Sequence, residues 1–149
     1  MKSLKNKAQV HSIEELKDFV KKNLQILKQP KQIILLEGEM GSGKTEFVKQ
    51  LVSLIGGDFA TSPSFAIHNT YETPQLSIEH VDLYRLVSED DLHSVGFWDL
   101  FENETSMVIV EWSNKIKFDR LPLTWKKQIL KFKILSESER EISFEFLSS

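Results

Sequence analysis

Apolar residues recur at helical spacing near the start of the chain. They are Ile13, Leu16, Val20, Leu24 and Leu27. Ser12-x-x-Glu15 has the form of a capping box ahead of them, and Pro30 ends the pattern. The spacing therefore predicts a first helix over residues 13–28. The polar residues 1–9 are expected to fray.

Two short runs are apolar at every position and predict buried strands. They are Ile33 to Leu36, reading IILL, and Met107 to Val110, reading MVIV. A glycine-rich turn and a second amphipathic helix follow the first run, and Gly56-Gly57 is a stop signal for that helix. The apolar residues of the helix are Phe47, Val48, Leu51, Leu54 and Ile55.

Apolar and polar residues alternate in two segments near the end of the chain, Gln128 to Leu135 and Glu141 to Leu147. With a turn at Ser136 to Arg140, they are predicted to form an antiparallel hairpin on one side of the sheet.

The middle of the chain has weaker patterns. Leu76 to Leu83 is predicted to be a strand, although Glu79 and His80 interrupt its apolar run, and we interpret His80 as a packing or hydrogen-bonding residue rather than a catalyst. Residues 88–104 are predicted to form short acidic helices around an aromatic cluster at 96–101 that closes the core.

Composition limits the possibilities. A chain of 149 residues that is 40% hydrophobic supports one well-buried core, so we expect a single domain over residues 1–149. The absence of cysteine excludes disulfides, thiolate metal sites and a cysteine nucleophile. The apolar runs are too short to cross a membrane, and the Lys-rich start lacks the apolar stretch of a signal peptide. A cytoplasmic protein is expected.

The net charge of −3 conceals a segregation along the chain. Residues 1–31 carry eight lysines against three acids, residues 72–111 carry ten acids against one arginine, and residues 115–133 carry seven basic residues against one acid. This pattern fits an acidic docking region flanked by basic surfaces that touch RNA, but it also fits ordinary solvated faces, which we favour.

The strongest chemical signal is Gly38-x4-Gly43-Lys44-Thr45, which follows the first apolar run and matches a phosphate-binding P-loop. The glycines allow close approach of the backbone, and the helix N-terminus favours an anion. Lys44 would reach the β- and γ-phosphates, and Thr45 would place its hydroxyl on Mg2+. The alternative is a glycine-rich turn that binds nothing. The expected backbone donors to ATP are Glu39, Met40, Gly41, Ser42, Gly43, Lys44 and Thr45.

Three further residues are candidates for the same site. Ser64 lies in the hydroxyl-rich segment 61–71, which is either a loop that senses the γ-phosphate or a Ser-Pro turn opening an edge strand. Asp82 and Glu111 each end a predicted strand, where P-loop proteins place acids that hold Mg2+ or its waters. Because Glu111 ends the cleaner apolar run, we place it on Mg2+ directly or through one water. We place Asp82 near the γ-phosphate, orienting the attacking water or a water bound to the metal.

These pieces in order resemble the TsaE (YjeE) family of small bacterial ATPases that act in making threonylcarbamoyladenosine on tRNA. The resemblance covers about residues 10–114 and rests on GEMGSGKT, SPSF, HVDLYRL, VGFWDLF and VIVEW. It implies an α/β P-loop NTPase-like three-layer fold with a mixed parallel and antiparallel sheet. It further implies weak ATP hydrolysis with Mg2+, and action with the partner proteins TsaB and TsaD, tRNA being engaged indirectly through that complex.

The same resemblance implies roles for single residues. Lys44 and Thr45 are the phosphate and Mg2+ residues, Asp82 is the essential acid, and Glu111 is a metal-side acid. Trp112 is the family's functionally important aromatic residue.

Three positions depart from the family pattern. Ser64 stands where threonine is usual, Ser113 where proline is common, and Glu46 where a second Thr or Ser is frequent. Glu46 adds negative charge to the first helical turn, so its orientation toward bound phosphates matters.

A P-loop also occurs in proteins of three other functional classes, namely kinases, GTPases and modules that bind nucleotide without hydrolysing it. A small-molecule or nucleotide kinase would surround the migrating phosphate with several arginines, whereas the chain has only Arg85, Arg120 and Arg140. A GTPase is unsupported, because the loop that would read guanine has Lys117 in place of an acid and the chain contains no Asp-x-x-Gly. A module that binds nucleotide without hydrolysing it stays open.

Overall fold

The computed structural model describes residues 2–57, 68–84, 86, 88, 90–94, 96–112 and 116–148. In these ranges a seven-stranded sheet runs in the order β1-β7-β6-β2-β5-β4-β3. The strands are β1 (Lys2–Val10), β2 (Gln32–Gly38), β3 (His68–Glu72), β4 (Ser77–Asp82), β5 (Ser106–Glu111), β6 (Lys126–Ile134) and β7 (Arg140–Ser148). β2 pairs in parallel with β5 and β6, and β4 with β5. The other three pairings are antiparallel, so the predicted mixed sheet is confirmed.

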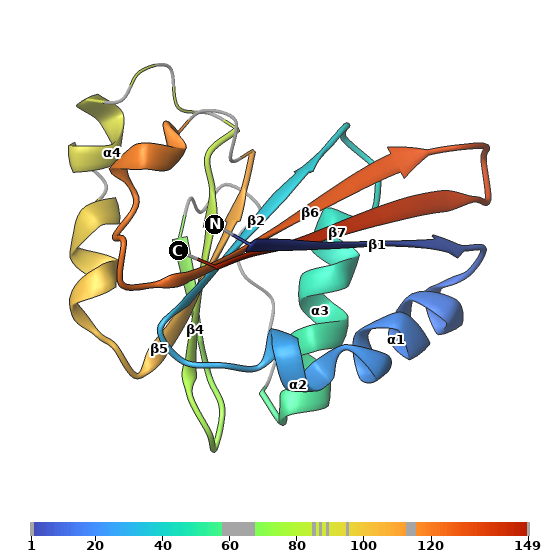
Figure 1. The fold of residues 1–149 in the computed structure, drawn as a ribbon, viewed down its shortest axis with the longest axis horizontal. Helices are drawn as coiled ribbons and strands as arrows, with labels where there is room; N and C mark the ends of the chain where they lie inside the picture. Colours follow the sequence, from blue (N-terminus) through green and yellow to red (C-terminus); the bar gives the residue numbers. More distant parts are fainter. Residues whose placement is uncertain are drawn as a thin grey trace.

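Helices cover both faces of the sheet (Figure 1). One face carries α1 (Ile13–Lys22), α2 (Leu24–Leu27) and α3 (Lys44–Ile55). The other carries α4 (Asp90–Ser94) and the 3-10 helices η1 (Phe97–Glu102) and η3 (Phe118–Arg120). The predicted three-layer α/β fold is therefore confirmed.

The central strand β2 shows why its sequence is apolar at every position. Ile34 and Leu36 belong to the core under α1 and α3, whereas Ile33 and Leu35 belong to the core on the opposite face. A strand buried on both faces needs apolar residues at successive positions rather than at alternate ones. The same holds for β5, in which all six residues are buried.

The second helix and the hairpin are confirmed. α3 begins after Gly43 and ends at Gly56, whose φ of 94° is the left-handed conformation typical of a glycine that ends a helix. β6 and β7 pair in antiparallel register from Lys127↔Leu147 to Ile134↔Arg140.

The expectation that residues 1–9 fray is wrong. Residues 2–10 form β1, which pairs with β7 along its whole length, from Lys2↔Ser148 to Val10↔Arg140. Val10 is buried in the core, and Ala8 packs against it. The strand is fixed by ladder hydrogen bonds to a neighbour distant in the sequence, which a polar composition does not reveal.

The first helix is shorter than predicted. It ends at Lys22, and residues 24–27 form the separate short helix α2. Asn23 makes the break, because its side-chain amide donates to the Phe19 carbonyl at 2.8 Å. Asparagine competes in this way with the helical backbone pattern.

Part of one prediction lies outside the described residues. Of the hydroxyl-rich segment 61–71, for which the alternatives are a γ-phosphate-sensing loop or a turn opening an edge strand, only the residues from His68 onward are described, as part of β3. Among the described residues, no helix has the length and apolar character needed to cross a membrane.

Candidate functional site

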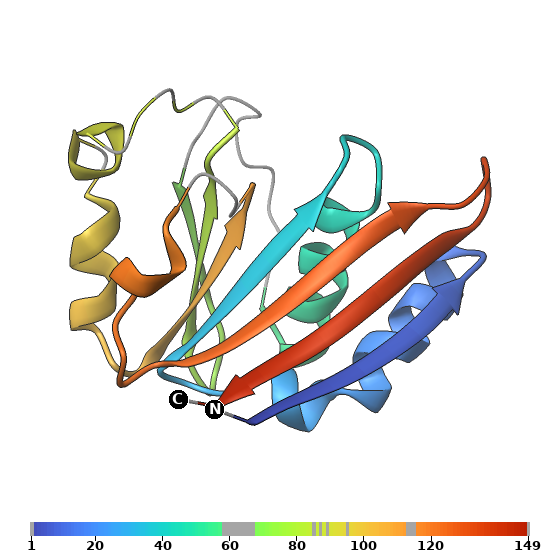
Figure 2. The ribbon, with the colours of Figure 1, turned by 45° about the horizontal axis from the view of Figure 1, so that its top comes forward.

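The predicted site residues meet where parallel strands end. β2 runs directly into the phosphate loop, residues 38–45, and Asp82 and Glu111 are paired in register at the ends of β4 and β5. Figure 2 shows these three strands pointing toward the same edge of the sheet, beside the N-terminus of α3. In open α/β sheets this edge is where ligands bind.

A cavity of about 450 Å³, which we call the strand-end pocket, opens at this edge. Its lining brings together most of the residues singled out from the sequence. They are Met40, Gly41, Gly43, Lys44, Thr45, Glu46, Lys49, Asp82, Tyr84, Glu111 and Trp112.

The phosphate loop depends on glycine at specific positions. Gly43 has φ 111° and precedes α3, a conformation that residues with a Cβ rarely adopt. A Cβ on Gly38 would lie 2.7 Å from the Phe132 carbonyl oxygen, so a side chain there would push the loop off β6. The Ser42 N–H, one of the predicted donors to phosphate, already donates to the Glu39 carbonyl within the loop, at 3.1 Å.

The Lys44 ammonium has two partners within the protein. Its Nζ donates to the Gly38 carbonyl at 2.6 Å and lies 3.6 Å from the centre of the Trp112 ring. A cation over an indole face is attracted by the ring quadrupole. Burial lowers the pKa of the Lys44 ammonium below its ordinary value, while the carboxylates of Glu111 and Asp82 oppose that shift.

Trp112 reaches this position through an unusual backbone conformation. Its φ of 62° lies in the left-handed region, which costs of order 1–3 kcal/mol for a residue that is not glycine. The indole also stacks on the Tyr84 ring, with 4.9 Å between centroids. Observed strain at a pocket is a reason to suspect function there.

Glu111 is a buried acid with two side-chain neighbours. It is 3% exposed. One carboxylate oxygen, Oε2, lies 2.6 Å from His80 Nε2, and the other, Oε1, accepts from the Thr45 hydroxyl at 3.4 Å. His80 is thus a hydrogen-bonding residue, as expected from the sequence. Its pairing with Glu111 had no sequence signal, because it depends on the register between β4 and β5.

Asp82 occupies a different environment. Its side chain is half-buried, and Oδ1 accepts the backbone N–H of Tyr84 at 3.0 Å, which fixes the turn after β4. Among the described residues the second oxygen has no hydrogen-bond partner that would keep it from the strand-end pocket, which Asp82 lines.

The geometry fits a magnesium ion beside a bound phosphate. Thr45 Oγ1 and Glu111 Oε1 are adjacent oxygen atoms, the ligand type that Mg2+ prefers. Among the described residues no three His, Asp or Glu side chains form a metal cluster.

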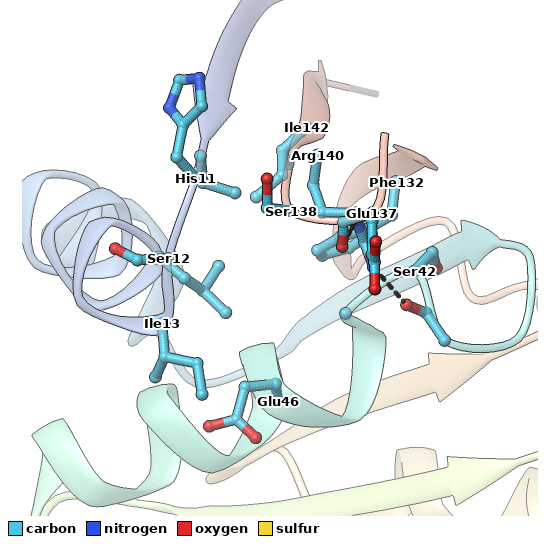
Figure 3. A pocket seen from close by; sticks show the side chains of 14 residues that line it. His11, Ser12, Ile13, Ser42, Glu46, Phe132, Glu137, Ser138, Arg140 and Ile142 are labelled. Atoms are coloured by element: carbon cyan, nitrogen blue, oxygen red, sulfur yellow. Dashed lines mark hydrogen bonds between the residues drawn. The ribbon is translucent and has the colours of Figure 1, made fainter. Parts of the chain in front are cut away.

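A second cavity of about 220 Å³, the hairpin pocket, lies on the other side of the phosphate loop. Figure 3 shows it between the start of α1, the loop and the β6–β7 hairpin. It is lined by Val10, His11, Ser12, Ile13, Leu16, Gly41, Ser42, Gly43, Glu46, Phe132, Glu137, Ser138, Arg140 and Ile142. Sequence reasoning missed this pocket, because its walls come from three segments that it treated only as fold elements.

Arg140 and His11 make the polar contacts at the hairpin pocket. Arg140 Nη2 donates to the Gly41 carbonyl at 3.3 Å, tying the hairpin to the phosphate loop. His11 lies between Glu15 and Glu139, at 2.9 Å and 3.3 Å. The hydrogen bond to Glu15, with the charges of both carboxylates, raises the pKa of His11 above its ordinary value.

The remaining candidates are placed as follows. Glu39 and Met40 are exposed at the tip of the loop. Ser42 is buried at the hairpin pocket, and its hydroxyl has no hydrogen-bond partner among the described residues. Glu46 lines both pockets, and its Oε1 accepts from the Gln50 side chain at 3.0 Å. Ser64 lies outside the described residues.

Comparison with known proteins shows one family and several relatives that resemble this chain over most of its length. The chain matches the family described as threonylcarbamoyl adenosine biosynthesis protein TsaE over residues 10–142. It is 35% identical over 119 residues to the tRNA threonylcarbamoyladenosine biosynthesis protein TsaE of Rickettsia bellii, across 78% of this chain and 81% of that one. The protein of the same name from Bacillus subtilis is 33% identical over 132 residues, across 88% of this chain and 79% of the relative. The crystal structure of B. subtilis YdiB superposes with a TM-score of 0.74 at 26% identity, covering 99% of this chain and 89% of that one.

Proposed function

The chain belongs to the TsaE family, which is involved in tRNA threonylcarbamoyladenosine biosynthesis, and we propose that it serves there as a Mg2+-dependent ATPase. The observation that carries the proposal is the convergence of Lys44, Thr45, Asp82 and Glu111 on one pocket at the mouth of a phosphate loop. This set contains a cation for phosphates, a hydroxyl and a buried carboxylate for the metal, and a second acid for water.

Binding of the triphosphate requires Lys44 to move. Its contacts with Gly38 and Trp112 keep the ammonium satisfied in a buried place, and the phosphates offer it stronger, charge-assisted partners. Thr45 and Glu111 would hold the magnesium ion, whose chemistry is to neutralise charge on the β- and γ-phosphates.

The base and ribose are assigned to the hairpin pocket. It adjoins the first turn of α3 at Glu46, where a nucleotide leaves the phosphate loop, and its deep wall is apolar, from Phe132 and Ile142. The Ser42 hydroxyl, which has no hydrogen-bond partner among the described residues, offers a donor at the hairpin pocket. An apolar slot with a few polar groups is the usual form of a base site.

Hydrolysis is expected to be slow in the isolated chain. Asp82 is placed to orient the attacking water, but among the described residues no arginine lines the strand-end pocket. A group supplied or positioned by a partner is worth about 10³–10⁵ in rate in P-loop NTPases. The same lack of arginines leaves the alternative of a small-molecule or nucleotide kinase without support.

The partners proposed are TsaB and TsaD, with tRNA engaged indirectly through their complex, in the cytoplasm. Single-turnover hydrolysis of ATP, measured for the chain alone and with purified TsaB and TsaD, tests the proposal. Slow turnover that rises on adding the partners is the expected result. Fast turnover unaffected by them, or hydrolysis in no mixture despite tight ATP binding, would contradict it.

A further inference from the structure

Glu111 lines the strand-end pocket and is assigned to the metal, whereas its buried partner His80 has no part in the proposed function so far. His80 and Glu111 extend the residue series of Ile78 and Ile109, which face the core beneath α3. Both side chains therefore leave the same face of the sheet, beside the start of α3 where Thr45 lies. The imidazole spans diagonally from β4 to the end of β5.

Burial makes this contact obligatory for the acid. Glu111 is 3% exposed and His80 6% exposed, so water solvates the carboxylate only weakly. A buried charge without partners is costly, and an ionised carboxylate can only accept hydrogen bonds. Nε2 of His80 must therefore carry the proton that points at Oε2, and the Thr45 hydroxyl is the donor to Oε1.

The two oxygens of the Glu111 carboxylate have different partners and therefore different roles. Oε2 is occupied by the imidazole, whereas Oε1 faces the hydroxyl that is assigned to Mg2+. The contact with Thr45 is long, at 3.4 Å, and that with His80 short, at 2.6 Å, so the histidine is the firmer tether. The His80 ring itself lies beside the buried ring of Tyr71, with 6.2 Å between centroids.

We infer that His80 is a positioning residue that holds the Glu111 carboxylate so that a single oxygen, Oε1, is presented to the magnesium ion beside Thr45. The inference rests on the proposed function and refines it. Groups that orient metal ligands in this way typically contribute about 10–100-fold to metal affinity.

The first test compares His80→Ala with His80→Gln. Glutamine keeps an N–H donor near the position of Nε2, so it should restore what alanine loses. We expect His80→Ala to raise the Mg2+ concentration needed for half-maximal ATP binding by about 10–100-fold, with the affinity for metal-free ATP unchanged. Calorimetric titration with ATP, with and without Mg2+, measures both quantities.

His68→Ala is the matched control. His68, in the edge strand β3, pairs with Glu79 of β4, which is the same histidine–carboxylate chemistry, and neither residue lines the strand-end pocket. This variant should keep the wild-type requirement for Mg2+. The inference is overturned if His80→Ala keeps it too, or if His80→Ala weakens metal-free and Mg2+-bound ATP equally, which indicates a structural role alone.

A second measurement needs neither metal nor nucleotide. Melting temperatures of His80→Ala, Glu111→Ala and the double variant form a cycle that isolates the pairwise coupling. If the two residues are coupled, the double variant should melt at a higher temperature than the sum of the two single shifts predicts. That result supports the tether, and additive shifts refute it. Failure of the proposed function would appear separately, as a wild-type chain that binds no ATP.

Discussion

The strand-end pocket contains two charged side chains that are buried and held by neighbouring groups, whereas the hairpin pocket has apolar walls and its His11 is half exposed. Lys44 and Glu111 are 5% and 3% exposed, and each has at least two partners from neighbouring elements. In the hairpin pocket, Phe132 and Ile142 are buried, while half of the His11 side chain is exposed.

This difference indicates how the two pockets divide the work on one nucleotide. Buried charges that neighbouring groups hold in place act strongly on phosphates and metal, because the surroundings screen them little. Apolar walls bind a base through contact area, which is worth about 25 cal/mol per Å² and depends weakly on the exact partner. Substitutions in the strand-end pocket should therefore have large and chemically specific effects, and those in the hairpin pocket smaller ones.

The largest effect is expected from Asp82, which separates the roles of the two acids. Asp82→Ala should leave ATP binding nearly intact and lower hydrolysis by about 10²–10⁴-fold, the usual worth of a positioned acid or base. Glu111→Ala should instead weaken Mg2+-ATP relative to metal-free ATP. Turnover assays run beside Mg2+ titrations on both variants distinguish the roles. The reversed pattern would make Asp82 the direct ligand, and our assignment of the two acids would be wrong.

A somewhat smaller effect is expected when the cation of the strand-end pocket is removed. Lys44→Ala should weaken ATP binding by about 1.5–3 kcal/mol, the worth of a hydrogen bond to a charged group. Calorimetry measures the change. Lys126→Ala is the control, because Lys126 lies in β6 and pairs with the exposed Gln29 side chain. ATP affinity unchanged in Lys44→Ala would remove the basis of the phosphate site.

The hairpin pocket should respond more weakly and only to ligands that carry a base. Ile13 lines it and is 59% exposed, so its side chain is free to contact a ligand. Ile13→Ser should weaken ATP by about 1 kcal/mol through lost apolar contact, and leave inorganic triphosphate binding unchanged.

Ile26→Ser provides the control for this comparison, since Ile26 is 39% exposed and does not line the pocket. Competition titrations against a fluorescent ATP analogue measure both ligands. Equal losses for ATP and inorganic triphosphate in Ile13→Ser would place the base elsewhere.

The smallest expected effect is one of pH at the mouth of the hairpin pocket. Because its folded-state pKa is raised, His11 contributes stability that is fully present below its unfolded pKa of about 6.5 and is lost as the pH rises through the folded value. Glu15 has a lowered pKa, chiefly through its hydrogen bond with His11, so its contribution is lost at acid pH.

The melting temperature should therefore show a shallow fall as the pH rises above about 6.5, and His11→Gln should remove that fall. Thermal unfolding followed by circular dichroism across this range, on both proteins, is the measurement. An identical slope in the two proteins would show that His11 does not link α1 to the hairpin.

The contrast between the pockets also explains what the sequence could predict. Lys44, Thr45, Asp82 and Glu111 lie in a local motif or at the ends of strands, and parallel strands bring their ends together, so their meeting could be inferred. The tether from His80 could not, because it depends on strand register. The indole of Trp112 over Lys44 depends on one backbone angle, a φ of 62°.

The hairpin pocket was out of reach for a related reason. It exists because β1 pairs with β7 and delivers His11 and Ile13 beside the hairpin and the phosphate loop. The polar start of the chain carries no periodic signal for that strand, so the expectation of fraying also hid the pocket. Tertiary pairing decided the structure there, rather than local propensity.

The claim that one nucleotide spans both pockets is tested most directly by a crystal structure with Mg2+ and a non-hydrolysable ATP analogue. We predict the base between the start of α1 and the β6–β7 hairpin, Lys44 moved from Gly38 and Trp112 onto the phosphates, and the metal beside Thr45 and Glu111. A nucleotide whose base lies outside the hairpin pocket, or a Lys44 that stays on Trp112 with phosphates bound, would contradict it.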